Sequence, residues 1–592
     1  MTLDRRAIGD ALNRLAFAAE ILDDDTVDAK TCAGLAWGLR SAEGELTLER
    51  IASMDGMSTP ILAVIDDAAN DREAPLLAAL EARVPPGLLE VRRLKGLGPK
   101  KIRALWQQLD ITSVGELEYA CTENRLVELK GFGQKTQESV LEQIAALRAR
   151  AGLLRLDQGR AVALQLAAVL EALHPVDAAG RGVRTAVAGD VRRGVEVVAE
   201  VALVTTAPVA AAVAAVARCA AAEADEDAAP GAAAGAPRAL APEVRVEGAF
   251  VRGRVGTIAV LVRAGVPDAR FAAALIVDTG SGAHVEALRA RAKARGLTLE
   301  EIEAADEDGV YAALDLVATD PERREVGVPL VEKGSARPRL ITRADLQGSL
   351  HNHTTASDGT ASMREMRDAA AARGMRYLAI TDHSKSAVYA KGLGPSSLEA
   401  QREEARTLNG EGTGTPACTL VTGVESDILK DGALDYTPEV LRALEIVVSS
   451  VHSRFGQKGA DLTARMVAAA HNQYTDVVGH PTGRLLLGRA PSEYDVSALL
   501  EACATSGCAV ELNANPARLD LNERHLAEAR ARRIPVSIAA DAHSIDALDH
   551  LEYGVIIARR AGLTVEDVLN ARPLAELRAW LSARRTRARA NA

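Results

Sequence analysis

The sequence predicts a multidomain protein with an all-α N-terminal region, an α+β middle and a C-terminal barrel of alternating strands and helices. Its 592 residues are enough for about four domains. The part before residue 150 shows only helical periodicity, as in the apolar series Ile8, Leu12, Leu15, Ala19 and Leu22. After a Pro- and Arg-containing linker at residues 334–345, short Val/Ile runs alternate with helical Ala/Leu/Arg segments, which is typical of an α/β domain.

The composition excludes several classes of protein. The net charge is −11, so any binding of nucleic acid must come from a local basic patch. The six cysteines have no CxxC spacing, which argues against a disulfide framework and fits a reducing cytosol. The N-terminus lacks the apolar run of a signal peptide, and the most apolar window, residues 201–216, is shorter than the roughly 20 residues that span a bilayer. We therefore expect a cytoplasmic monomer with no membrane segment.

Changes in residue pattern divide the chain into five expected regions. These are a helical domain at 1–85, a tandem of helical hairpins at 86–150, a mixed region at 151–265, a second mixed region at 266–340 and an α/β domain at 346–580. The stretch 220–242 is rich in Ala, Gly, Pro and acidic residues and offers no face for packing. We therefore expect a flexible insertion near 206–242, inside the third region.

One short motif, L-K-G-Φ-G-x-K, occurs twice in the helical region, at residues 94–105 and 129–140. Two glycines around an apolar residue allow a tight hairpin whose backbone N–H groups open the next helix and can bind phosphate. Residues 91–150 hold 11 Lys/Arg against 7 Asp/Glu, so this is the local basic patch. The candidate DNA-binding residues are Gly96, Gly98, Lys100 and Lys101 in the first copy and Gly131, Gly133 and Lys135 in the second.

This motif resembles the helix-hairpin-helix, which grips the sugar-phosphate backbone without reading sequence. The resemblance implies DNA as a partner. A single copy could be only a helical turn, but two copies favour a functional tandem. A weaker third copy at residues 51–62 has Ser58 where the second glycine would stand, so it could be purely structural.

Seven apolar, strand-like runs between residues 346 and 560 each end beside a polar residue, and most of these residues are potential metal ligands. In a barrel of parallel strands such side chains converge on one mouth. A lone histidine is more often a core or surface residue, as we interpret His471, His525 and His550. The candidate ligands are His351, His353, Asp358, His383, Glu425, His452, His480, Asp541 and His543.

Nine nitrogen and oxygen ligands are too many for one ion and suit two or three divalent ions. Imidazole mixed with carboxylate favours Zn, Mn or Fe over Ca or Mg, and we expect Mn or Zn, with Fe as a further candidate. Such a cluster activates water and stabilises the charge of a phosphoryl transition state. The pattern therefore predicts metal-assisted hydrolysis of a phosphoester.

The ligand motifs HNH, TDH, GVES, SVHS, GHP and ADAH, with Asp358 after the first, resemble the polymerase and histidinol phosphatase (PHP) family over residues 346–575. This resemblance implies a distorted seven-stranded β/α barrel with a trinuclear metal site. It also implies phosphate contacts in catalysis, for which the candidates are Lys385, Arg454 and Arg484.

The middle of the chain resembles the palm and thumb of bacterial X family DNA polymerases, at residues 189–204 and 271–299. Two-metal nucleotidyl transfer needs carboxylates at i and i+2 of one strand and a third on its neighbour. Here those positions hold Glu200, Ala202 and Ala259, and Asp190 replaces the serine that would contact the triphosphate. We therefore predict a palm retained as scaffold. The pair Arg192 and Arg193 is interpreted as solvated surface on an exposed strand.

Together these features predict a DNA-binding, metal-dependent phosphodiesterase, a 3′-5′ exonuclease acting in DNA repair at the nucleoid. Three alternatives stay open: an X family polymerase that is still active, a PHP phosphatase acting on a small phosphate ester, and a non-catalytic DNA-binding scaffold with structural metals. The sequence does not choose the metal or the strand polarity, and it identifies no protein partner.

Overall fold

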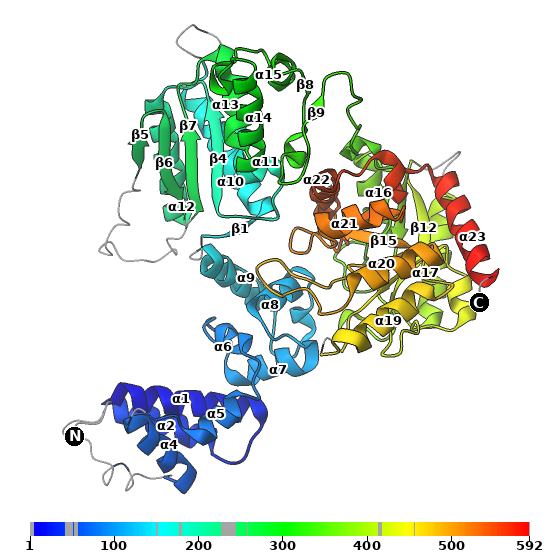
Figure 1. The fold of residues 1–592 in the computed structure, drawn as a ribbon. Helices are drawn as coiled ribbons and strands as arrows, with labels where there is room; N and C mark the ends of the chain where they lie inside the picture. The colour runs from blue at the N-terminus through cyan, green and yellow to red at the C-terminus, as the bar shows by residue number, and fades with distance from the viewer. Residues whose placement is uncertain are drawn as a thin grey trace. The chain divides into compact units, whose positions relative to one another are not determined.

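A computed structural model describes residues 5–41, 51, 57–70, 72–149, 152–176, 180, 182–226, 244–256, 258–411, 417–454 and 456–590. It divides into two compact units, residues 1–144 and 145–592 (Figure 1). No helix in these described ranges combines the length and the apolar character needed to cross a bilayer.

The first unit is helical throughout its described residues, as the sequence predicts. The apolar series on α1 is buried from Ile8 to Ala19 and packs against α2, α4, α5 and α7. Of the weak third hairpin copy, residues 52–56 lie outside the described part of the chain, and Ser58 directly precedes α4. The helices are α1 (Arg5–Leu22), α2 (Ala29–Ser41), α4 (Thr59–Ala69), α5 (Pro75–Glu81), α6 (Gly87–Val91), α7 (Pro99–Leu109), α8 (Val114–Thr122), η1 (Leu126–Glu128) and α9 (Gln134–Ala149).

The second unit begins with a five-stranded sheet of order β2-β4-β7-β6-β5. Alternate residues of β4 face opposite sides: Val201 and Leu203 pack toward α10 and α12, and Ala202 packs toward α13 (Figure 1). The elements are β1 (Leu154–Arg155), α10 (Leu156–Leu173), β2 (Thr185–Ala188), α11 (Gly189–Arg193), β3 (Val197–Val198), β4 (Glu200–Thr205), α12 (Val209–Glu226), β5 (Arg245–Glu247), β6 (Phe250–Val255) and β7 (Ile258–Arg263).

The flexible insertion expected near 206–242 is wrong for its first half. Residues Val209–Glu226 form α12, which buries Ala212, Ala215, Val216 and Cys219 against α10 and β6. Alanine is the strongest helix former, and its small side chain lets a helix approach a sheet closely. Composition alone could not distinguish this packed helix from a loop. Residues 227–243 lie outside the described ranges.

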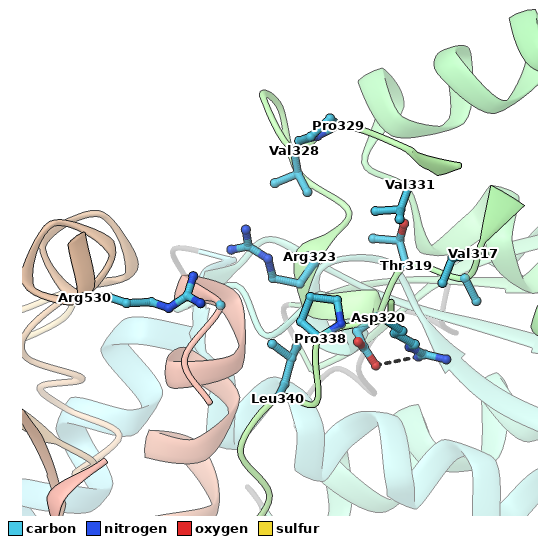
Figure 2. Close-up of a pocket in the computed structure, with 13 residues that line it drawn as sticks. Val317, Thr319, Asp320, Arg323, Val328, Pro329, Val331, Pro338, Leu340 and Arg530 are labelled. Atoms are coloured by element: carbon cyan, nitrogen blue, oxygen red, sulfur yellow. Dashed lines mark hydrogen bonds and ion pairs between the residues drawn. The ribbon is translucent and has the colours of Figure 1, made fainter. Parts of the chain in front are cut away.

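A smaller helical layer follows the sheet, built around a core that includes Ile276, Leu288 and Tyr311. Its elements are η2 (Asp268–Arg270), α13 (Phe271–Thr279), α14 (Gly282–Ala294), η3 (Leu299–Glu301), α15 (Glu307–Ala313), β8 (Leu316–Val317), η4 (Pro321–Arg323), β9 (Val331–Glu332) and η5 (Arg343–Asp345). A cavity of about 210 Å³ lies between residues 317–340 and Arg530 and Gly562 (Figure 2). None of its lining residues is a candidate metal ligand, so this cavity is separate from the predicted site.

The last part is a seven-stranded parallel barrel whose strands pair in chain order, β10 to β16. A parallel bridge between Asn352 and Ala542 brings the first and last strands together. The strands are β10 (Gly348–Ser349), β11 (Tyr377–Ile380), β12 (Thr419–Asp427), β13 (Ile446–Ser450), β14 (Val477–Val478), β15 (Ala509–Asn513) and β16 (Val536–Ala539).

Helices cover the outside and one end of this barrel. Leu577 and Leu581 of α23 pack among Tyr377 and Ala509, the first residues of their strands. Helix α23 therefore closes the amino-terminal end, and the opposite end is left for a site. The helices are α16 (Met363–Ala372), η6 (Val388–Ala390), α17 (Pro395–Asn409), α18 (Pro438–Arg442), α19 (Gly459–His471), α20 (Val496–Ser506), α21 (Glu523–Ala531), η7 (Asp546–His550), α22 (Leu551–Ala561), η8 (Val565–Asp567), η9 (Leu569–Ala571) and α23 (Leu574–Ala590).

Candidate metal centre

The carboxyl ends of the barrel strands bring all nine predicted metal ligands together. Asp358 lies in the loop between β10 and α16, Glu425 lies inside β12, and the other ligands directly follow their strands. Side chains at this end of parallel strands point toward a common mouth. All nine side chains are almost fully buried.

Glu425 lies at the centre of the cluster. Its Oε1 is 3.2 Å from His351 Nε2, 3.1 Å from His452 Nε2 and 3.0 Å from His480 Nε2. Its other oxygen, Oε2, is 2.9 Å from His383 Nδ1. One carboxylate therefore faces imidazoles from four different strands, an arrangement suited to bridging two cations.

Two aspartates complete the cluster on either side. Asp541 Oδ1 lies 3.1 Å from His353 Nε2 and 3.4 Å from His351 Nε2. Asp358 lies 3.4 Å from His383 Nε2 through Oδ2, and 3.3 Å from His543 Nε2 through Oδ1. Asp541 also has a left-handed backbone, with φ of 51°. The candidate ligand His480 and the neighbouring Arg454 also have positive φ, of 23° and 60°.

The ligand atoms fall into three overlapping groups, within each of which all atoms lie within 4.8 Å of one another. His353 and His383 each belong to two groups, so the three groups are parts of one continuous cluster. The groups are His353, Asp358, His383 and His543; His351, His353 and Asp541; and His383, Glu425 and His452.

The donor atoms suit divalent metal ions. Within the described ranges, His351 Nε2, His353 Nδ1, both ring nitrogens of His383 and Glu425 Oε2 are buried without a hydrogen bond. Buried polar atoms almost always have a partner, and these lie together rather than scattered. A mixture of imidazole and carboxylate is the donor set of Zn, Mn and Fe sites. The residues present therefore fit a metal cluster.

Neighbouring groups fix the orientation of three ligand imidazoles. His351 Nδ1 is 2.7 Å from Glu511 Oε2, and His452 Nδ1 is 2.6 Å from Asp427 Oδ1. His543 Nδ1 is 3.0 Å from the carbonyl of Asp541. Such contacts hold a ring so that its other nitrogen faces the metal. The sequence prediction missed Glu511 and Asp427, although Asp427 follows Glu425 by two positions, the spacing of one strand face.

Burial also sets the protonation of the cluster. Burial lowers the pKa of His353 to about 3, and the charges of His543 and His383 act in the same direction. Burial, with the positive charge of Arg518, lowers the pKa of His480 to about 3. Both rings are therefore neutral at pH 7, the form that binds metals. Burial also opposes charge on His383, but Asp358 and Glu425 outweigh it and raise its pKa to about 10.

Two of the three predicted phosphate contacts lie on loops at the ligand end of the barrel. Lys385 is exposed two residues after His383, with its Nζ 5.8 Å from the ring centre of Tyr436. Arg454 is exposed two residues after His452 and has a left-handed backbone, with φ of 60°. Their positions allow them to meet a substrate.

The expectation for Arg484 is wrong, because its guanidinium is already engaged. It is only 7% exposed and makes a double ion pair with Glu196, at 3.0 and 2.6 Å. Its remaining donors bond the carbonyls of Arg518 and Leu519. Because these partners already occupy the buried guanidinium, Arg484 is not available to bind a phosphate. It connects the region of the five-stranded sheet to the barrel.

The backbone that Arg484 holds carries another charged residue, Arg518, to the metal cluster. Arg518 is 3% exposed, and its Nε lies 3.8 Å from Asp541 Oδ2. The sequence prediction missed Arg518, since nothing in its local sequence marks it. Arg518 therefore places a buried positive charge beside Asp541.

The candidate polymerase site keeps one carboxylate of the three that the motif requires. Strands β4 and β7 are parallel, with Glu200 opposite Ala259, so the predicted positions are neighbours. Glu200 is partly exposed and lies 3.7 Å from Arg252 Nη1. Ala202 is buried against Phe271. Asp190 accepts a hydrogen bond from Arg193.

The interpretation of Arg192 and Arg193 as solvated strand residues is wrong. Both lie on the short helix α11, with side chains 21% and 12% exposed. Arg192 makes two hydrogen bonds of 2.7 Å to Glu307, and Arg193 pairs with Glu325 at 2.9 Å. Their partners follow more than 100 residues later in the chain, beyond the reach of a local pattern.

The two hairpins of the first unit have the geometry that the motif predicts. Gly96 and Gly131 have φ of +83° and +91°, which other residues rarely adopt. Gly98 caps α7, and no atom lies within 4 Å of a Cβ placed on any of the four motif glycines. Lys101 lies 5.3 Å from the ring centre of Phe132, and Gln143 bonds the backbone of Lys95 at 2.6 Å. The two copies therefore pack as one unit with open glycine turns.

Comparison with family models first defines the class of protein. Residues 349–515 match the PHP domain, and residues 88–146 match the SAM-like helix-hairpin-helix tandem. These matches agree with the barrel and with the hairpins. The chain is thus a DNA-processing, metal-dependent hydrolase.

Individual relatives then define the family. The chain is 30% identical over 582 residues to the DNA polymerase/3′-5′ exonuclease PolX of Bacillus subtilis (strain 168), covering 96% of this chain and 98% of that protein. It therefore belongs to the PolX family of bacterial X family DNA polymerases with a C-terminal PHP domain. Two further relatives are described as probable phosphatases. One, from Thermoanaerobacter sp. (strain X514), is 26% identical over 37% of this chain and 88% of its own length, and one, from Edwardsiella ictaluri (strain 93-146), is 26% identical over 38% and 89%.

Proposed function

We propose that the chain is a metal-dependent phosphodiesterase that removes nucleotides from the 3′ end of DNA during repair, on a polymerase scaffold that no longer synthesises DNA. The observation that carries this proposal is the contrast between two sites in one chain. The barrel holds nine buried candidate ligands, each with a nitrogen or oxygen atom within 3.3 Å of another of the nine, and the polymerase motif has two alanines in place of carboxylates.

The proposed metal ligands are those predicted from the sequence, and two or three Mn²⁺ or Zn²⁺ ions would be held by them. Their overlapping groups, the buried ring and carboxylate atoms that make no hydrogen bond, and the neutral rings of His353 and His480 support this assignment. When bound, such ions supply activation of water and stabilisation of negative charge on the phosphoryl group. The chain itself contributes the orientation of the ligands, through Glu511 and Asp427, and the exclusion of solvent from the site.

The proposed DNA-binding site consists of the two hairpins with their glycines and lysines. Their helix N-termini present backbone N–H groups, and Lys100 and Lys135 are exposed beside them. Backbone contacts of this kind hold DNA of any sequence, which suits an enzyme that trims ends at the nucleoid. Lys385 and Arg454 are the proposed contacts for the phosphate being cleaved.

The experiment that tests this function uses purified full-length protein and a primer-template labelled at either the 3′ or the 5′ end of the primer. With Mn²⁺ or Zn²⁺ and no nucleotides, we expect a 5′-labelled primer to shorten stepwise and a 3′ label to leave at once as a mononucleotide. Loss of a 5′ label as mononucleotide, or internal cutting, would contradict the proposed polarity.

A second candidate function is hydrolysis of a small phosphate ester. It is favoured by the probable phosphatases that match the barrel region. The hairpins count against it, because a phosphatase of small esters does not need a grip on a DNA backbone. Phosphatase activity that is unchanged by a large excess of competing DNA, with no release of nucleotides, would favour this alternative.

A further inference from the structure

A ten-residue loop, residues 384–393, follows the candidate ligand His383 and is held rigidly at both ends. Leu393 N donates to the carbonyl of His383 at 2.8 Å, and Ser384 N donates to the carbonyl of Glu425 at 3.0 Å. Between these ends, Ser386 N donates to Asp435 Oδ2 at 2.7 Å. The position of the loop is therefore fixed by the same strands that position the metal ligands.

The loop also closes so tightly that one position requires glycine. A Cβ added at Gly392 would lie 1.9 Å from the carbonyl oxygen of Ser384, closer than any real contact. The turn η6 sits at the tip of this closed loop and buries Ala387 and Ala390, which are 1% and 0% exposed. One face of the turn is thus anchored in the barrel, and its other face must point outward.

That outward face carries Val388, which is 81% exposed, the largest exposed fraction of any large apolar side chain in the described part of the protein. A single exposed apolar residue is common on protein surfaces and by itself indicates no function. This one is fixed on an anchored turn, five residues after a candidate metal ligand. Binding of a ligand that covers this side chain removes apolar surface from water, which favours binding.

The residues around Val388 suit a nucleotide. The ring of Tyr389 lies edge-on to His383, with ring centres 6.3 Å apart at 61°. Lys385 is exposed on the same loop. Proteins that bind single strands without reading sequence combine aromatic side chains that stack on the bases with cations for the phosphates. This loop presents both kinds of group beside the metal cluster.

We propose that residues 384–393 form a platform for the terminal nucleotide of a DNA strand, with Val388 and Tyr389 against its base and sugar and Lys385 toward a phosphate. The proposal rests on the proposed nuclease function and names the ligand that this loop recognises. A small phosphate ester without a base makes no use of Val388. The platform therefore selects a polynucleotide end over small esters.

The test combines a change in the platform with a change in the substrate. The substrates are two single-stranded oligonucleotides that differ only at the 3′ end, one with a normal terminal nucleotide and one with an abasic sugar. Covering an exposed valine side chain is worth about tenfold or more in binding, so we expect wild-type protein to cleave the base-bearing end about tenfold better, mainly through a lower KM. Val388→Ser should bring the two substrates close together by raising KM for the base-bearing end alone.

A matched control is Val326→Ser, which removes an equally exposed valine, 79% exposed, from a segment outside the barrel. It should keep the wild-type preference, and Val388→Ile should keep it too. The proposal is overturned if Val388→Ser keeps the wild-type ratio, or if wild-type protein does not distinguish the two ends. Absence of cleavage of both substrates by wild-type protein would instead overturn the nuclease function itself, and the platform with it.

Discussion

Replacing His353 with alanine should abolish nuclease activity and leave DNA binding nearly unchanged. His353 belongs to two of the three ligand groups, and its Nε2 lies 3.1 Å from Asp541 Oδ1. Its ring also stacks on His543, with centres 4.1 Å apart. The substitution therefore removes one ligand from the cluster and loosens the neighbouring ligand at the same time.

The magnitude follows from what a metal ion contributes. An ion that stabilises phosphoryl charge and activates water contributes several kcal/mol to the transition state. Loss of about 4 kcal/mol corresponds to a decrease of about a thousandfold in kcat. DNA affinity should change little, because the proposed DNA-binding site belongs to the other compact unit.

The assay measures 3′-end degradation, bound metal and DNA affinity for the same protein samples. The matched control is His471→Ala, which removes an exposed histidine at the end of α19; it should behave as wild type. Circular dichroism of each variant excludes unfolding as the cause. Activity of His353→Ala within about twofold of wild type, after metal depletion and restoration of Mn²⁺, would refute the assigned site, because no ion would then depend on this ligand.

Three further predictions concern other parts of the chain. Gly96→Val with Gly131→Val should weaken DNA binding and flatten its salt dependence, because both glycines have positive φ and phosphate contacts release counterions; an unchanged slope in a salt titration would show that the hairpins are only structural. Glu196→Ala should lower kcat of the nuclease with little effect on its KM. The reason is that Glu196 fixes the guanidinium of Arg484, which in turn bonds the backbone carbonyl of Arg518. Glu552→Ala, which breaks the exposed ion pair with Arg160, is the control for Glu196, and equal loss in both variants would contradict the link. Glu307→Gln should lower the melting temperature at pH 7: burial alone would raise the pKa of Glu307, but hydrogen bonds from Arg192 and Arg324 lower it from 4.5 to about 2. This stabilisation is present above about pH 4.5 and is lost as pH falls toward 2, so the variant and wild type should converge at acid pH, and a constant difference would contradict the assignment.

The sequence was sufficient for the parts of the site that follow a local rule. Except for Asp358, each candidate ligand follows or lies in a strand-like run, and parallel strands bring such residues together whatever the details of the fold. The hairpin glycines were found in the same way, because positive φ at Gly96 and Gly131 is a local requirement. Asp427 was within reach of the same reasoning, through its spacing of two from Glu425.

Partners that are distant in the chain could not be found in this way. Arg484 looked like a phosphate contact because it follows a ligand motif, yet its partner Glu196 lies 288 residues away. Arg192 looked solvated, yet Glu307 pairs with it from 115 residues away. The prediction of a flexible insertion at 206–242 failed for a different reason. Alanine-rich sequence occurs both in packed helices such as α12 and in unpacked chain, so composition does not distinguish the two.

The central claim is that the barrel carries the chemistry and that the polymerase motif no longer does. The most direct measurement follows a 5′-labelled primer-template with Mn²⁺ and all four nucleotides, with wild-type protein and with His353→Ala, in which degradation cannot hide synthesis. The account predicts that wild-type protein shortens the primer and that His353→Ala leaves its length unchanged, because Ala202 and Ala259 supply no oxygen for a metal ion. A ladder of longer products from His353→Ala would contradict it.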